Sequence, residues 1–162
     1  DVIAVGKIYD IFDGEGVTEK IKTTGNTNGI AFTKALQTRD FEGLAFVNLV
    51  DFDMLYGHRR DVAGYAAAAT EFDKFVADFI PGMREGDILM VTADHGCDPS
   101  YTKTTDHTRE YVPYLICGKG VKPGVDLGTK LCFGTIAQTI CDYLGVDAST
   151  LDGQSVLSDI LA

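Results

Sequence analysis

The sequence has 162 residues, of which 45% are hydrophobic and 23% are charged. These values are typical of one globular domain with a sizeable core. Acidic residues outnumber basic ones by 24 to 14, which gives a net charge of −10, and no basic stripe offsets it. This balance argues against nucleic acid and against an anionic membrane as partners. No apolar run is long enough to predict a transmembrane helix, and no secretory signal pattern opens the chain.

The four cysteines show no CxxC spacing, so we expect free thiols in a reduced, cytoplasmic protein. The sequence begins at Asp1 and passes at once into the apolar residues 2–5, without an initiator Met. We therefore expect the chain to be part of a longer protein.

Hydrophobic patterning predicts that strands alternate with helices along the chain. The helix over residues 60–80 can be capped by Asp61 and ended by Pro81-Gly82, and the last long helix can be closed by Gly145. A short helix or turn is expected near the end, over 149–161. The predicted elements, in chain order, are a strand at 2–9, a helix at 27–38, a strand at 43–50, a helix at 60–80, strands at 87–91 and 111–117, and a helix at 133–144.

This order predicts an α/β fold with a mostly parallel sheet flanked by helices. In such sheets ligands bind beyond the carboxyl ends of the strands. The helix at 60–80 is the crossover expected if the strands at 43–50 and 87–91 are parallel. The polar loop at 96–110 is long for a compact domain, which favours a functional role.

The carboxyl end of the strand at 87–91 carries the most informative residues. Asp94 and His95 follow the apolar run directly, and Gly96 permits the backbone to turn there. On a regular strand the two side chains would point to opposite faces, so they can converge only if the strand has ended. The alternatives for this stretch are a pair of metal ligands, or a turn-capping Asp beside an exposed His.

The other two histidines of the chain also lie in loops beside an aspartate. The strand at 43–50 leads into Asp53 and His58, and Asp106 precedes His107. Imidazole nitrogens and carboxylate oxygens are the usual ligands of a divalent transition metal where thiolates are not used. Five such groups exceed the needs of one catalytic ion and suit a two-metal site, with ions about 3.5–4 Å apart. The predicted ligands are Asp53, His58, Asp94, His95 and His107.

Further polar residues near these loops are assigned supporting roles. For Asp51, a capping or supporting role is favoured over ligation, and Cys97 is interpreted as a bystander. Arg59, Arg60 and Arg109 can meet a phosphate or pair with a site carboxylate, although a solvated salt bridge is the commoner outcome. The residues expected to order the loop rather than to react are Asp98, Thr105, Asp106 and Thr108.

Three stretches carry a resemblance to a known family. They are Asp51 to Val62 (DFDMLYGHRRDV), Thr92 to Gly96 (TADHG) and Thr105 to Pro113 (TDHTREYVP). Together they resemble the phosphopentomutases of the alkaline phosphatase superfamily, and the similarity spans essentially the whole chain. The fold implied is an incomplete alkaline-phosphatase-like core.

The resemblance implies interconversion of ribose 1-phosphate and ribose 5-phosphate, and of the deoxyribose pair, in nucleoside salvage. It implies two Mn²⁺ ions, with Asp94 and His95 on one ion and Asp53, His58 and His107 on the other. It also brings Lys7 near the substrate; the alternative for Lys7 is a solvent-facing side chain at a strand end.

The sequence matches only part of the length of family members. Family members carry an N-terminal segment with a further metal-binding Asp and a threonine that becomes phosphorylated, and an inserted cap domain. None of these has a match here, so residues 1–162 correspond to the C-terminal portion of the metal-binding core. We expect the chain alone to be inactive as a mutase, to need the N-terminal part of the same protein as its partner, and to oligomerise or expose an apolar face. Another phosphomutase or phosphodiesterase activity of the superfamily, and a non-catalytic metal-binding module, remain the alternatives.

Overall fold

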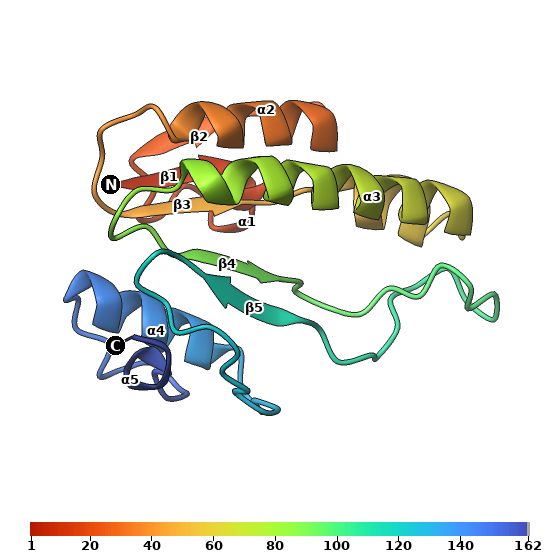
Figure 1. Cartoon of the computed structure of the whole chain (residues 1–162). Coiled ribbons are helices and arrows are strands. Elements are labelled where there is room, and N and C mark those ends of the chain that lie inside the picture. The colour runs from red at the N-terminus through yellow and green to blue at the C-terminus, as the bar shows by residue number, and fades with distance from the viewer. Residues whose placement is uncertain (162) are drawn as a thin grey trace. The chain divides into compact units, whose positions relative to one another are not determined.

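The computed structural model describes residues 1–161 as an α/β protein (Figure 1). The described chain divides into two compact units. The first contains Asp1–Arg84 and Met90–Leu115; the second contains Glu85–Leu89 and the chain from Ile116 onward. The helices and strands, in chain order, are β1 (Val2–Val5), α1 (Ile8–Ile11), β2 (Glu19–Ile21), α2 (Asn26–Leu36), β3 (Leu44–Val47), η1 (Phe52–Gly57), α3 (Val62–Phe79), η2 (Ile80–Gly82), β4 (Leu89–Thr92), β5 (Tyr114–Cys117), α4 (Gly134–Leu144) and α5 (Leu157–Ile160).

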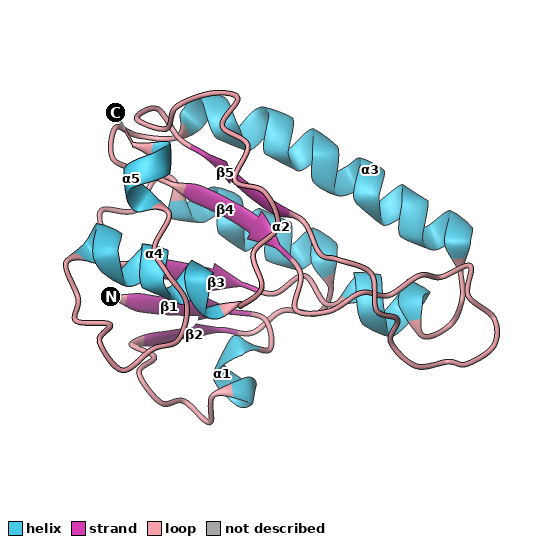
Figure 2. Ribbon diagram, turned by 90° about the horizontal axis from the view of Figure 1, so that it is seen from below, coloured by secondary structure: helices cyan, strands magenta, loops and turns pink. Residues whose placement is uncertain are grey.

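A parallel sheet of order β2-β1-β3 forms the centre of the first unit, and Figure 2 shows its three strands side by side. Val5 pairs with Ile21 on one side and with Val47 on the other, both in parallel register. Ile3 and Val5 are almost fully buried and pack with Leu36 of α2. The predicted parallel sheet with flanking helices is therefore confirmed.

Two helices cover one face of this sheet. α2 packs on β1, and α3 packs against α2, so both lie on the same side in Figure 1. Asp61 caps α3 as expected, because its Oδ1 accepts a hydrogen bond of 2.9 Å from Gly64 N. The start of α2 is tied to the residue that precedes η1 by a reciprocal pair of hydrogen bonds: Asn26 N donates to Asp51 Oδ2 at 2.7 Å, and Asp51 N donates to Asn26 Oδ1 at 2.9 Å.

The first strand is shorter than predicted. It ends at Val5, because Gly6 adopts a left-handed φ of 85°, and residues 8–11 form α1 instead of continuing the strand. The edge strand β2 was not predicted. With three residues and a single apolar one, Glu19-Lys20-Ile21 gives no alternation for a periodicity argument to detect.

Two other elements differ from the sequence-based prediction. Phe52–Gly57, expected as a loop, forms the π-helix η1. In addition, β4 pairs with β5 in a separate two-stranded sheet, so within residues 1–161 it is not a hydrogen-bonded neighbour of β3. The helix α3 therefore leads from one sheet to the other and is not a crossover inside one sheet.

In the second unit, α4 packs against α5. α4 is closed by Gly145, as predicted, and this residue adopts a left-handed conformation with a φ of 67°. Thr139 is fully buried; its hydroxyl donates to Thr135 O at 2.7 Å and accepts from Val156 N at 3.1 Å. The short helix expected near the end of the chain is α5.

Large apolar side chains are exposed in both units. Phe12 and Phe46 are about half exposed and lie with ring centroids 6.2 Å apart, and Leu131 of the second unit is 93% exposed. These residues agree with the expectation of an exposed apolar face, while oligomerisation stays a prediction. Among the described residues, no helix combines the length and apolar character needed to cross a membrane.

Candidate metal centre

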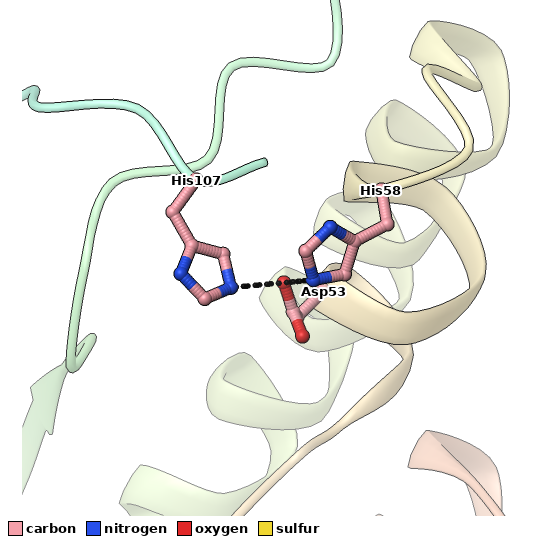
Figure 3. A group of neighbouring side chains, drawn as sticks. All are labelled: Asp53, His58 and His107. Atoms are coloured by element: carbon pink, nitrogen blue, oxygen red, sulfur yellow. Dashed lines mark ion pairs between the residues drawn. The ribbon is translucent and has the colours of Figure 1, made fainter. Parts of the chain in front are cut away.

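Three of the predicted ligands converge in the first unit (Figure 3). Asp53 Oδ1 lies 3.2 Å from His58 Nε2 and 3.4 Å from His107 Nε2. One ligand atom from each residue falls within 4.8 Å of the other two. We call these three residues the Asp53 cluster. Its two imidazoles and one carboxylate, each partly open to solvent, form a donor set that fits a divalent transition metal with open coordination positions.

The π-helix η1 explains why Asp53 and His58 face one another. On an α-helix, residues five apart would point about 140° apart around the axis. In η1 the backbone N–H of His58 donates to Asp53 O at 3.0 Å, which is the i→i+5 hydrogen bond of a π-turn. This turn brings the two side chains onto one side of the helix, as Figure 3 shows. The five-residue spacing of Asp53 and His58 therefore suits a π-helix, where it would not suit an α-helix.

A backbone contact fixes the orientation of the His58 ring. His58 Nδ1 lies 2.6 Å from Thr105 O. Because a carbonyl oxygen can only accept, Nδ1 carries the proton in the neutral ring, and Nε2 then presents its lone pair toward Asp53. A neutral imidazole with a free Nε2 is the form that binds a metal ion.

His107 comes from the long polar loop, whose two ends are joined. Gly96 and Thr108 form an isolated antiparallel bridge, and Thr108 N donates to Gly96 O at 3.0 Å. The Thr108 hydroxyl also accepts from Asp98 N at 2.6 Å, and Asp106 Oδ1 accepts from His107 N at 2.8 Å. Asp106 and Thr108 thus order the loop backbone, as expected. We call residues 96–108 the His107 loop.

The remaining predicted ligands, Asp94 and His95, lie beside the Asp53 cluster. The His95 ring stacks on the His107 ring, with centroids 3.6 Å apart and an interplanar angle of 21°. His95 Nε2 is 3.6 Å from Asp94 Oδ1, and the Asp94 side chain is 80% exposed. A cavity of about 200 Å³ lies next to His95, and Tyr65 and Pro113 help to line it. Within residues 1–161 the Asp53 cluster is the one set of three converging ligand atoms, so Asp94 and His95 stay predicted ligands.

Lys7 and Asp51 take different positions at the same edge of the sheet. Lys7 follows the carboxyl end of β1, is exposed, and immediately precedes α1. Since β1 and β3 are parallel neighbours, it emerges at the edge that also leads to η1. Asp51 caps α2 through Asn26, which agrees with the supporting role favoured for it.

Cys97 is more than a bystander in the packing. Its Sγ lies 3.9 Å from Asp53 Oδ1, and it fills the space beside Gly57, where a β-carbon would overlap Sγ. Burial, followed by the negative charge of Asp53, raises the pKa of the Cys97 thiol. Burial likewise raises the pKa of Tyr65, whose ring packs edge-on against Phe52 of η1. Both residues support η1 from the side of the cluster.

The sequence-based reasoning missed the role of Arg60. A solvated salt bridge was favoured for it, with contact to a phosphate or a site carboxylate as the alternative, but its guanidinium donates to backbone carbonyls of the His107 loop and of η1. A positive φ of 56° at a non-glycine residue marks this position as unusual; Arg60 lies in the stretch Asp51 to Val62, but that stretch does not show which groups its side chain binds.

Comparison with known proteins identifies the family. The family model of the Metalloenzyme superfamily matches residues 3–148. The chain belongs to the Metalloenzyme superfamily. Membership of a metalloenzyme superfamily and the donor set of the Asp53 cluster both indicate a metal cofactor.

Curated proteins named phosphopentomutase are closely similar to this chain. The phosphopentomutase of Acetivibrio thermocellus is 53% identical over 160 residues, which cover 99% of this chain and 41% of that protein. The phosphopentomutase of Lachnoclostridium phytofermentans is 52% identical, with 99% and 40% covered, and that of Anaeromyxobacter sp. (strain K) is 50% identical, with 98% and 40% covered. The resemblance to phosphopentomutases is confirmed, and the chain spans about two fifths of the length of these curated relatives.

Proposed function

We propose that this chain is the C-terminal, metal-binding part of the catalytic core of a phosphopentomutase, in a protein that also has a cap domain and an N-terminal segment. The convergence of Asp53, His58 and His107 carries the proposal. It occurs in a chain about half identical to proteins named phosphopentomutase. The reaction is the interconversion of ribose 1-phosphate and ribose 5-phosphate, and of the deoxyribose pair. We assign it to cytoplasmic nucleoside salvage.

The proposed metal set is two Mn²⁺ ions. Asp53, His58 and His107 would hold one ion, and Asp94 and His95 would contribute to the other. The short distances from Asp53 Oδ1 to both imidazoles support the first assignment. The stacking of His95 on His107 supports the second, because it brings His95 beside the cluster. When bound, the ions would supply charge stabilisation for phosphoryl transfer.

The chain's own residues would prepare the site for a sugar phosphate. Thr105 O holds the proton on His58 Nδ1 and keeps Nε2 free. Lys7, exposed at the edge where β1 and β3 end, would bind the negatively charged substrate. The phosphate-accepting threonine would come from the part of the relatives that this chain does not span, so the chain would provide ligands and not the nucleophile.

The test compares the 162-residue chain with the same chain extended to the full length of its relatives. Both proteins are expected to bind Mn²⁺, measured by electron paramagnetic resonance titration. Only the extended protein is expected to convert ribose 1-phosphate to ribose 5-phosphate, followed by ³¹P NMR. Mutase turnover by the short chain alone would contradict the division of roles. An extended protein that hydrolyses phosphodiesters or moves phosphate on another substrate class would replace the mutase assignment.

A further inference from the structure

Arg60 occupies a junction between the two segments that carry the Asp53 cluster. It lies two residues after His58 and just before α3, with a left-handed φ of 56°. A β-branched or bulky residue is unusual in this conformation, and any non-glycine residue there needs support from its surroundings. The support comes from the side chain, which turns back over η1 toward the His107 loop.

The guanidinium uses all five of its N–H donors on backbone carbonyls. Nε and Nη2 donate to Thr104 O at 2.9 and 2.6 Å, and Nη2 also donates to Asp106 O. Nη1 donates to Gly57 O at 3.1 Å and to Asp98 O at 3.0 Å. Since all five N–H groups already bind backbone carbonyls, none is free to donate a hydrogen bond to a phosphate.

These acceptors connect the two halves of the cluster. Gly57 O belongs to the last residue of η1, the helix that holds Asp53 and leads into His58. The carbonyls of Asp98, Thr104 and Asp106 belong to the His107 loop. The intervening carbonyl of Thr105 accepts from His58, so three consecutive carbonyls, at residues 104–106, are all bound by the segment 58–60. One side chain therefore ties the loop of His107 to the helix of Asp53.

We propose that Arg60 is a positioning residue for the metal centre: its guanidinium holds the His107 loop against η1 and sets the distance from His107 to Asp53. The proposal rests on the proposed function in taking the Asp53 cluster as a metal site. Lysine cannot replace it, because an ammonium is a point donor and lacks the planar fork that reaches four carbonyls at once. The five hydrogen bonds of the side chain offset the cost of the positive φ at this non-glycine residue.

The first measurement is Mn²⁺ affinity of the 162-residue chain and its variants, by electron paramagnetic resonance titration. Arg60→Gln keeps a β-carbon in the same left-handed backbone and removes only the cationic fork. It is expected to raise the Kd about 10- to 100-fold, the range for lost groups that orient metal ligands. Arg60→Lys is expected to restore little of this. Arg59→Gln makes the same charge change one residue away and is expected to leave the Kd within about twofold.

The second measurement needs no metal. Lys103 is exposed in the His107 loop, next to Thr104, and a lysine-specific protease is expected to cut after it faster when this segment detaches from Arg60. Arg60→Gln is expected to speed this cut about tenfold or more in the metal-free chain, as loss of charge-assisted hydrogen bonds to the loop predicts, and Arg59→Gln is not. In Arg60→Gly, which suits the positive φ, added guanidinium ion at millimolar concentration is expected to slow the cut and improve Mn²⁺ binding. A fold that was merely destabilised would show no such rescue.

The outcomes separate the two proposals. If Arg60→Gln binds Mn²⁺ as the unmodified chain does and its loop is cut no faster, the positioning role is overturned. If the unmodified chain binds no Mn²⁺ and yet Arg60 protects Lys103 from cleavage, the proposed metal site is wrong. The attachment of the His107 loop to η1 by Arg60 would still be supported.

Discussion

The two parts of the predicted ligand set are built differently. The Asp53 cluster draws its residues from a helix and from a loop some fifty positions away in the sequence, yet its ligand atoms lie within 4.8 Å of one another. Asp94 and His95 are adjacent in the sequence, but Asp94 is 80% exposed and its Oδ1 lies 3.6 Å from His95 Nε2. Residues adjacent in the sequence therefore do not bring their ligand atoms together by adjacency alone; hydrogen bonds to the backbone have the larger effect.

The support differs in kind as well. Each member of the Asp53 cluster is held by hydrogen bonds to backbone groups, through the π-turn of η1, Thr105 O and the Arg60 contacts. His95 is held mainly by the face of the His107 ring, with Nδ1 3.1 Å from Gly96 O. Two donors are fewer than a bound metal ion requires, so the Asp94–His95 pair needs further ligands to form a site.

The largest expected effect is a loss of Mn²⁺ affinity, and it should differ between the Asp53 cluster and the Asp94–His95 pair. Asp53→Ala removes the one carboxylate that both cluster imidazoles face. We expect Mn²⁺ affinity to fall by about 100-fold or more, since even supporting groups of a metal site are worth about 10- to 100-fold. Asp94→Ala is expected to cost less than about tenfold in the same titration. Equal losses in the two variants would show that the parts act as one site in this chain.

A smaller effect is expected from the packing behind the cluster. In Gly57→Ala the new β-carbon would overlap Cys97 Sγ and lie 2.9 Å from Phe52 O. We expect a loss of about 1–3 kcal/mol in the free energy of unfolding, measured by urea denaturation, because a close-packed site must shift to admit the methyl group. The distance of η1 from Cys97 would change with it, while β4 and the Asp94 turn are left alone.

Two variants control this prediction. Gly120→Ala adds the same methyl group where no atom lies within 4 Å, and is expected to change the unfolding free energy by less than about 0.5 kcal/mol. Combining Gly57→Ala with Cys97→Ala should recover part of the loss, leaving the contact with Phe52 O. A double variant no more stable than Gly57→Ala alone would mean that the thiol is not the group that obstructs the methyl.

The smallest effect concerns pH and the edge of the His107 loop. Ser100 donates to Asp98 Oδ1 from its hydroxyl at 2.6 Å and from its N–H at 2.7 Å, and these bonds hold the pKa of Asp98 below its usual value. The stabilisation is complete above the usual carboxyl pKa and is lost as the pH falls through the lower folded pKa. Ser100→Ala should raise the pKa of Asp98, followed by NMR titration of the carboxyl carbon, and leave Mn²⁺ affinity at neutral pH within about twofold.

The second unit contains a matched control for this titration. Ser149 donates to Asp147 with the same spacing, and its bonds likewise lower the pKa of Asp147. Ser149→Ala should raise that pKa and leave Asp98 unchanged. If Asp98 failed to respond to Ser100→Ala, the hydroxyl bond would not be the cause of its lowered pKa.

Much of the fold follows from local chemistry in the sequence. Pattern and propensity suffice to predict the apolar runs of β1 and β3, the Asp61 cap and the closure of α4 by Gly145, because each depends on a few neighbouring residues. The strand-end rule selected Asp53 and His58, which follow a strand of the parallel sheet. His107 was selected because, like the other two histidines, it lies in a loop beside an aspartate.

What could not be predicted depends on contacts between distant segments. The π-turn of η1 has no periodicity of its own, since sequence patterns are compared with the repeats of α-helices and strands. Arg60 makes its bonds to carbonyls about forty residues ahead, and a backbone carbonyl carries no residue identity that a motif could record. The packing of Cys97 against Gly57 could not be predicted for a related reason, because it joins residues forty positions apart in the sequence.

If metal ions bind as proposed, the stacked rings of His95 and His107 would couple the two ions. A ring fixed by an ion restricts the ring that lies on its face, so ordering His107 also removes part of the conformational entropy of His95. By thermodynamic linkage the effect runs both ways: an ion held through His95 would raise the affinity of the Asp53 cluster by the same factor. In that case the affinity of each ion would depend on the contact between the two imidazole rings as well as on its own ligands.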